Sequence, residues 1–177
     1  MNRIRAACDA RDEYTKMYGP GTGPLILART DACTAICDDD DDDDSASSSA
    51  VVPVGFEEAM KRCELFREVG ADMTFLEAPE SIEQMKEYCS KISGPKLANM
   101  LEYGTTPILT PKELKDIGYT MAAYPLTLLS SSIKAMQSSL DCIMTGQSTN
   151  DLITTFAETK YIVGFTQYAK EESIYKS

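Results

Sequence analysis

Histidine is absent from this sequence of 177 residues. Its absence excludes a Ser-His-Asp triad, a Cys-His nucleophile pair and any histidine-ligated metal site within the chain. Acid–base chemistry would therefore have to come from carboxylates, lysine, tyrosine, cysteine or a metal-bound water.

The sequence also lacks a second cysteine pair. Three residues separate Cys33 from Cys37, but neither a partner pair nor a histidine completes a zinc site. The six cysteines are spread widely, which favours reduced thiols of the cytosolic type. We therefore predict a cytoplasmic protein. Any organellar targeting segment would lie before Met1.

Long apolar runs and basic patches are missing as well. No stretch reaches the roughly 18–20 apolar residues that span a bilayer, and the first residues do not have the layout of a signal peptide. Lysine and arginine are scattered through a chain of net charge −11. The sequence therefore predicts neither a membrane nor a nucleic-acid partner.

Much of the negative charge lies in one run of seven aspartates, Asp38–Asp44. We interpret 33–53 as a low-complexity acidic loop, because lengthening a loop costs little, roughly 0.6 kcal/mol for each doubling. The alternative is a weak Ca²⁺ site or a site for a basic partner. The run lacks the alternation and the glycine of an EF-hand loop, so we favour the low-complexity loop.

Helical and strand patterns alternate along the rest of the chain. Helices are expected over 1–18, 55–70, 81–94, 110–118, 126–144 and within 151–175, and strands over 25–28, 73–77, 96–101 and 119–125. The apolar run 25–28 is typical of a strand buried on both faces. Strict β/α alternation predicts an α/β protein with a parallel sheet, either half of a (β/α)₈ barrel or a smaller open sheet.

Polar residues follow each predicted strand, where parallel β/α folds gather functional groups. The positions are Arg29, Asp31, Glu77, Asn99, Glu102 and Tyr124. An arginine holds a carboxylate or phosphonate through two parallel hydrogen bonds, a glutamate orients a hydroxyl, and an asparagine both donates and accepts. The set suits a small polyanionic substrate. The alternative is that these side chains only cap strands and hold loops in place.

Four segments together resemble the isocitrate lyase and phosphoenolpyruvate mutase superfamily. The nearest resemblance is to carboxyvinyl-carboxyphosphonate phosphorylmutase-like and oxaloacetate- or alkylmalate-cleaving members, over nearly the whole chain outside the acidic loop. The segments are LILARTDA, GFEEAMKRCELFREVGAD, MTFLEAP and LANMLEYGTTPILTPKELKDIGYTMAAYPLTLL.

This resemblance implies a swapped-helix (β/α)₈ barrel of the TIM type. It implies an Mg²⁺-dependent carbon–carbon lyase or phosphonomutase that acts on a 2-oxo or 2-hydroxy dicarboxylate. By motif, Arg29, Glu77 and Asn99 correspond to substrate-binding residues of the family, and Asp31 to a structural partner of its loop. Leu101 and Ser130 depart from the methylisocitrate-cleaving pattern.

The resemblance covers the C-terminal half of such an enzyme. The family's metal-binding aspartates and its Lys-Lys-Cys-Gly-His loop lie before the first residue seen here. We therefore expect a partial barrel of about four βα units over 1–148, a helical segment over 149–177, and neither metal ligands nor catalytic residues within this chain. A homo-oligomer or a second half-barrel would complete the fold. The alternative is a non-catalytic paralogue or fragment that serves as an interaction or assembly module.

Overall fold

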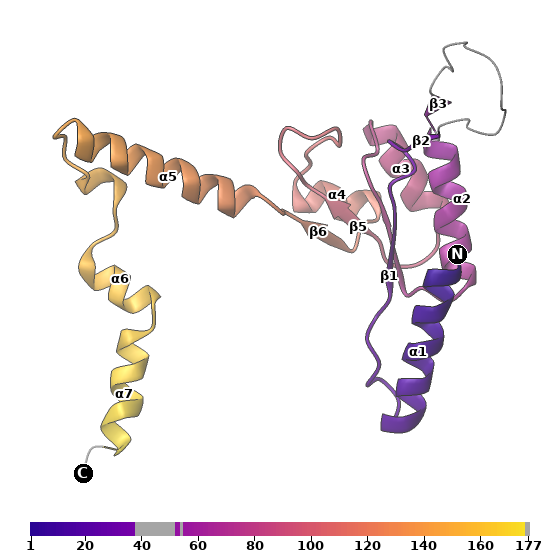
Figure 1. Ribbon diagram of the computed structural model, residues 1–177, viewed down its shortest axis with the longest axis horizontal. Helices are drawn as coiled ribbons and strands as arrows, with labels where there is room; N and C mark the ends of the chain where they lie inside the picture. The colour runs from indigo at the N-terminus through magenta and orange to yellow at the C-terminus, as the bar shows by residue number, and fades with distance from the viewer. Residues whose placement is uncertain (38–51, 54, 176–177) are drawn as a thin grey trace, which may run out of the picture. The chain divides into compact units, whose positions relative to one another are not determined.

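The computed structural model describes residues 1–37, 52–53 and 55–175 (Figure 1). These residues form two compact units, Met1–Thr127 and Leu128–Ser177. The Asp38–Asp44 run, and with it any ion or partner site there, lies outside the described residues. The domain boundary expected at 148/149 stays a prediction.

Apart from the short pair β2 and β3, which was not predicted, the first unit alternates helices and strands in the predicted order. Its elements are α1 (Asn2–Tyr18), β1 (Leu27–Thr30), β2 (Ile36–Cys37), β3 (Val52–Pro53), α2 (Gly55–Glu68), β4 (Met73–Leu76), α3 (Ile82–Lys91), β5 (Leu97–Asn99), α4 (Pro111–Ile117) and β6 (Met121–Ala123). The α/β class is therefore confirmed.

Four of the strands run parallel and in chain order. β1 pairs with β4 and β5 pairs with β6, both in parallel register. A parallel bridge between Thr74 and Lys96 connects the two pairs. The carboxyl ends of β1, β4 and β5 therefore lie along one edge, which is where the predicted polar residues sit.

The first strand differs from its prediction. It covers Leu27–Thr30 instead of 25–28, and its burial alternates. Ala28 and Thr30 are buried, while Leu27 and Arg29 are exposed. The expectation of a strand buried on both faces is wrong, because Phe66 of α2 packs only against the face that carries Ala28.

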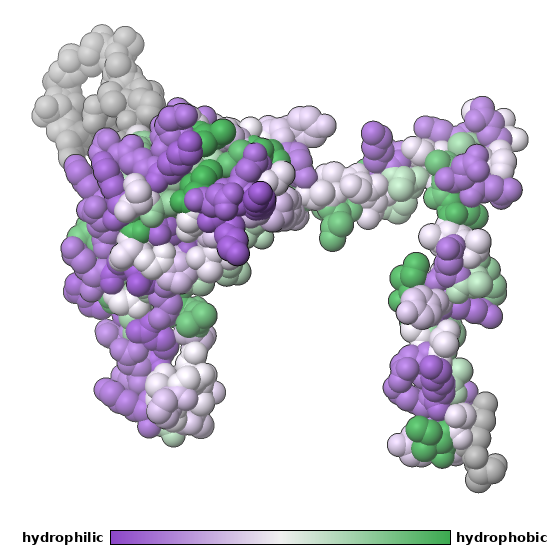
Figure 2. All heavy atoms as spheres, turned by 180° about the vertical axis from the view of Figure 1, so that it is seen from behind, coloured by the Kyte–Doolittle hydropathy of each residue, from purple (hydrophilic) through white to green (hydrophobic). Residues whose placement is uncertain are grey.

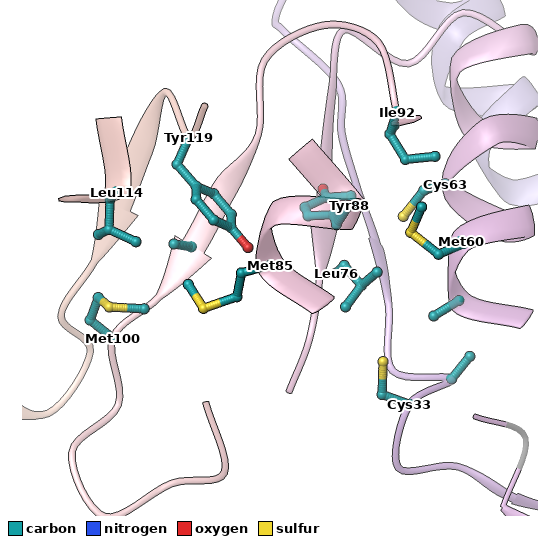
Figure 3. Close-up of a cluster of buried hydrophobic side chains, with 13 residues drawn as sticks. Cys33, Met60, Cys63, Leu76, Met85, Tyr88, Ile92, Met100, Leu114 and Tyr119 are labelled. Atoms are coloured by element: carbon teal, nitrogen blue, oxygen red, sulfur yellow. The ribbon is translucent and has the colours of Figure 1, made fainter. Parts of the chain in front are cut away.

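The main core lies between the strands and helices α2, α3 and α4 (Figure 3). Its largest fully buried side chain is Tyr88 of α3, whose hydroxyl lies 2.7 Å from the hydroxyl of Thr74. Lys96 is also buried; its Nζ donates to the carbonyl of Gly94 at 2.8 Å and lies 5.9 Å from the centre of the Tyr88 ring. Burial lowers the pKa of this lysine. Thr74, Tyr88 and Lys96 thus each have a partner inside the core.

A second, smaller cluster attaches α1 to the strands. Ala28, Phe66 and Ala71 are buried there, with Ile4 and Ile26 packed against them. Beside this cluster, Arg11 Nη1 lies 2.7 Å from Asp72 Oδ2, and the same oxygen accepts from the Ile26 N–H at 2.7 Å. One carboxylate therefore links the helix to the start of two strands.

The Asp72 contacts predict a pH-dependent stability. Burial alone raises the pKa of Asp72, but hydrogen bonds from the Ile26 N–H and from Arg11 outweigh burial, so the pKa falls below its ordinary 3.8. A carboxylate of lowered pKa stabilises the fold above its unfolded pKa, and this contribution is lost as the pH falls through the folded pKa. We expect Asp72→Asn to reduce the urea midpoint at neutral pH, and the gap to the wild type to close below about pH 4. A gap that stays constant down to about pH 2 would contradict the assignment.

The second unit is helical. It consists of α5 (Thr127–Met144, with its first residue in the first unit), a 3₁₀ turn (Asn150–Leu152), α6 (Phe156–Ile162) and α7 (Phe165–Tyr175). None of these elements contributes a buried residue, and hydrophobic side chains appear on this unit's surface in Figure 2. Within the described ranges, no helix combines the length and apolar character needed to cross a membrane.

Candidate functional site

A cavity of about 290 Å³ lies at the carboxyl ends of β1, β4 and β5. Its lining combines one guanidinium, two carboxylates, one amide and three threonines. The lining residues are Arg29, Asp31, Thr34, Glu77, Ala78, Asn99, Leu101, Gly104, Thr105 and Thr106. The parallel register of the strands brings together Arg29, Glu77 and Asn99, which the sequence predicted as substrate-binding residues.

Arg29 is held on three sides. Its Nε and Nη2 atoms donate to Asp31 Oδ1 at 3.1 and 2.6 Å, and Nη2 lies 3.5 Å from Glu77 Oε2. Its guanidinium carbon lies 4.7 Å from the centre of the Phe75 ring, which belongs to the register partner of Arg29 on β4. The hydrogen bond with Asp31 raises the pKa of Arg29 further, so the group is a permanent cation.

Asn99 forms hydrogen bonds that orient the Glu77 carboxylate. Its Nδ2 donates to both carboxylate oxygens of Glu77, at 3.2 and 3.3 Å. The amide nitrogen is therefore engaged, and the Oδ1 atom of Asn99 is the atom that remains to accept from a ligand. Glu77 is partly buried and is oriented by an amide on one side and a guanidinium on the other.

Two other strand-end candidates do not line this cavity. Glu102 accepts a hydrogen bond from Thr127 Oγ1, which lowers the pKa of Glu102. Tyr124 is exposed at the end of β6. Glu102 is better described as a loop-holding residue, which was the alternative weighed for all of these positions.

The backbone is unusual on both sides of the cavity. Ala78, directly after Glu77, has φ 56°, and Tyr103, in the loop that follows β5, has φ 64°. These are left-handed conformations that non-glycine residues adopt at some energetic cost. The residues beside the cavity are thus held in place by the surrounding fold at the expense of local strain.

The cavity residues do not fit a metal site by themselves. Their formal charges sum to −1, and both carboxylates contact Arg29. Within the described part of the chain, no group of three or more potential His, Cys, Asp or Glu ligands is close enough to hold a metal ion. An Mg²⁺ ion would need ligands from outside these residues.

A larger cavity of about 820 Å³ lies beside the first. It shares Arg29 and Asp31 with the smaller cavity, but most of its other lining residues come from the first residues of the chain and from α2, and it reaches neither Glu77 nor Asn99. We place the candidate site in the smaller cavity, because that cavity contains the cation, the carboxylate and the amide together.

Sequence reasoning missed Phe75 and the threonines. Phe75 lies on β4, two residues before Glu77, which directly follows the strand's last residue, so period-two alternation of an extended chain places both side chains on one face. That spacing was available as a signal. Thr34, Thr105 and Thr106 lie in loops, where no periodicity predicts which way a side chain points.

The sequence profile described as phosphoenolpyruvate phosphomutase matches residues 2–144. The chain is 32% identical over 178 residues to 2,3-dimethylmalate lyase of Eubacterium barkeri, covering 99% of this chain and 53% of that protein. It is 34% identical over 131 residues to the petal death protein of Dianthus caryophyllus, covering 72% of this chain and 41% of that protein.

Solved structures show the same likeness. The crystal structure of 2,3-dimethylmalate lyase superposes with a TM-score of 0.70 at 25% identity, covering 98% of this chain and 54% of that one. Oxaloacetate acetylhydrolase superposes with a TM-score of 0.76 at 24% identity, covering 99% and 54%, and this second match speaks for the fold alone. The chain spans about half or less of the length of these curated relatives.

Proposed function

Because the chain belongs to the phosphoenolpyruvate phosphomutase family of the isocitrate lyase and phosphoenolpyruvate mutase superfamily, we propose that it carries the carboxylate-binding half of an active site. The complete enzyme would be a carbon–carbon lyase or phosphonomutase for a small 2-oxo or 2-hydroxy dicarboxylate. The observation that carries the proposal is the contact between Arg29, Glu77 and Asn99 at the ends of three successive strands.

Each of the three residues has a distinct proposed role. Arg29 binds a substrate carboxylate, because its cationic donors form the strong, charge-assisted type of hydrogen bond. Glu77 accepts a hydrogen bond from a substrate hydroxyl or bound water, and Asn99 fixes its rotamer. Leu101 and the strained Ala78 line the same cavity and restrict its volume.

The remaining parts of the reaction lie outside these residues. We propose that the complete form is a (β/α)₈ barrel of which this chain supplies about half, and that it depends on Mg²⁺. The metal would stabilise the enolate charge that develops during cleavage. Its ligands and the general acid or base would come from the missing half, supplied by a second polypeptide or a longer form of the chain. A homo-oligomer and a cytoplasmic location also remain predictions.

Oxalate, a minimal dicarboxylate, provides a direct test. We expect the wild-type chain to bind oxalate weakly, with a Kd of about 1 mM, which corresponds to ~4.1 kcal/mol. Binding should persist in the presence of a chelator, without added Mg²⁺, and cleavage of oxaloacetate or 2,3-dimethylmalate should be absent. The measurement is a ¹⁵N-resolved NMR titration with sodium sulfate as a control for ionic strength.

The outcomes separate the two interpretations of the chain. Oxalate binding that perturbs residues around Arg29 supports the substrate-binding half-site. No binding up to about 20 mM oxalate, with folded spectra, would contradict it and would favour the non-catalytic assembly module.

A further inference from the structure

One two-pronged hydrogen-bonding edge of Arg29 is already occupied by the protein itself. A guanidinium offers a carboxylate two-pronged edges, and Asp31 takes the edge formed by Nε and Nη2, with distances of 3.1 and 2.6 Å to Oδ1. Nε also lies 3.3 Å from Oδ2 of the same carboxylate. Asp31 thus contacts Arg29 as a bound carboxylate ligand would.

We propose that Asp31 is an internal ligand of the substrate subsite, which an incoming carboxylate must displace from Arg29. The inference rests on the proposed function, because it assigns Arg29 to carboxylate binding. It gives Asp31 a role opposite to that of a structural partner: Asp31 sets the affinity of the site by competing with the substrate.

The burial of the two acidic partners indicates which one is displaced. The Asp31 side chain is 59% exposed, whereas that of Glu77 is 19% exposed and receives two hydrogen bonds from Asn99. Moving the Asp31 carboxylate into water therefore costs little, since exposed ion pairs contribute little to stability. Displacing Glu77 would break contacts with two neighbours and leave a half-buried charge without its partner.

Arg29 does not depend on Asp31 to keep its place. Phe75 is buried, and the guanidinium stacks on its ring at 4.7 Å while Glu77 approaches Nη2 from the next strand. Stacking of this kind orients the guanidinium plane without using its N–H donors. When Asp31 leaves, the Nε and Nη2 donors remain aimed at the same place, available to a ligand.

Charge adds to this competition. With Asp31 ionised, the side chains of Arg29, Asp31 and Glu77 carry a net charge of −1, which opposes a dianion. Removing the charge of Asp31 makes the trio neutral and removes the competing ligand in one step.

The test compares Asp31→Asn with a matched control. Asp12→Asn removes the same charge from an equally exposed aspartate, 58% exposed, that pairs with Arg11 at 2.9 Å outside the cavity. Oxalate is titrated into both variants and the wild-type chain while the ¹⁵Nε–H signal of Arg29 is followed. We expect Asp31→Asn to bind oxalate about fivefold more tightly, a change of ~1 kcal/mol, and Asp12→Asn to match the wild type.

A third variant separates competition from positioning. Phe75→Leu keeps an apolar side chain but removes the stacking surface, and we expect it to weaken oxalate binding severalfold. If Asp31 positions Arg29 instead, Asp31→Asn will weaken binding and Phe75→Leu will have little effect, which overturns the proposal.

The remaining outcomes are also decisive. Wild-type binding that requires Arg29 but does not tighten in Asp31→Asn would refute the internal-ligand role and leave the proposed function intact. A lack of binding in every folded variant would refute both. A gain in Asp12→Asn equal to that in Asp31→Asn would assign the effect to net charge and would likewise refute the internal-ligand role.

Discussion

Replacing Arg29 with glutamine is expected to weaken oxalate binding about 100-fold, beyond the measurable range for a ligand of millimolar affinity. A hydrogen bond to a charged group contributes about 1.5–3 kcal/mol, and ~1.4 kcal/mol corresponds to a factor of ten. The substitution also leaves Asp31 and Glu77 without their shared cation, so the cavity repels anions more strongly. In the NMR titration described above, this change would appear as the loss of the oxalate-dependent shifts around residue 29.

The matched control for this variant is Arg62→Gln. The Arg62 side chain is 42% exposed and that of Arg29 45% exposed, and Arg62 also pairs with a carboxylate, Glu58, at 2.9 Å. Arg62 does not line the smaller cavity. Equal losses in both variants would mean that net charge governs binding, and the assignment of the site to Arg29 would have to be abandoned.

The largest expected effect on stability comes from Tyr88→Ala. Removing a fully buried aromatic side chain costs about 3–5 kcal/mol, because the cavity it leaves fills only in part. Tyr88 lies within the core cluster (Figure 3), and its loss also removes the hydroxyl that pairs with Thr74 and the ring beside Lys96, which keeps its hydrogen bond to Gly94. A small domain is stable by only about 5–15 kcal/mol, so the variant should be close to unfolding at 37 °C.

Urea unfolding followed by circular dichroism measures this loss, and Tyr103→Ala is its control. Tyr103 is fully exposed, so removal of its side chain should change the free energy of unfolding by less than about 0.5 kcal/mol. Tyr88→Phe should fall between the two, at about 1–2 kcal/mol, because it removes only the hydroxyl that pairs with Thr74. If Tyr88→Ala proves as mild as Tyr103→Ala, the core described here is wrong.

Local sequence signals predicted helix boundaries well. The capping box expected at Thr110 and Glu113 is present in full, with Pro111 as the first helical residue and Gly118 in the left-handed conformation at the end. The box expected at Ser81 is only half present: Ser81 accepts from the Gln84 N–H, while the Gln84 side chain accepts from the N–H of Glu80 instead. The residues that form such a cap lie within four positions of one another, so the sequence alone is enough to predict where the helix begins.

Burial of the strands was harder to predict, because it depends on what covers each face. The run 25–28 is wholly apolar, yet Leu25 and Leu27 are exposed and the strand starts at Leu27. The pairing of β2 with β3 was missed altogether, since the two strands have two residues each and are separated by a low-complexity stretch with no alternation.

The sequence predicted which residues form the candidate site, but not the hydrogen bonds between them. Chain order and the parallel register suffice to bring Arg29, Glu77 and Asn99 to one edge. The Asn99 amide nitrogen donates to Glu77, and Arg29 donates to Asp31. Both hydrogen bonds depend on rotamers that tertiary contacts set. Those bonds decide which atoms remain for a ligand, and only the structure supplies them.

The short β2–β3 ribbon has an evolutionary consequence. Cys37 pairs with Val52, so the two residues that flank 38–51 lie side by side. Insertions and deletions between these two residues therefore need not move either end, and selection on the fold does not constrain their number. A change in the length of the Asp38–Asp44 run therefore leaves the β2–β3 pair in place, and with it the preceding segment that carries Asp31 and Thr34 to the carboxylate site.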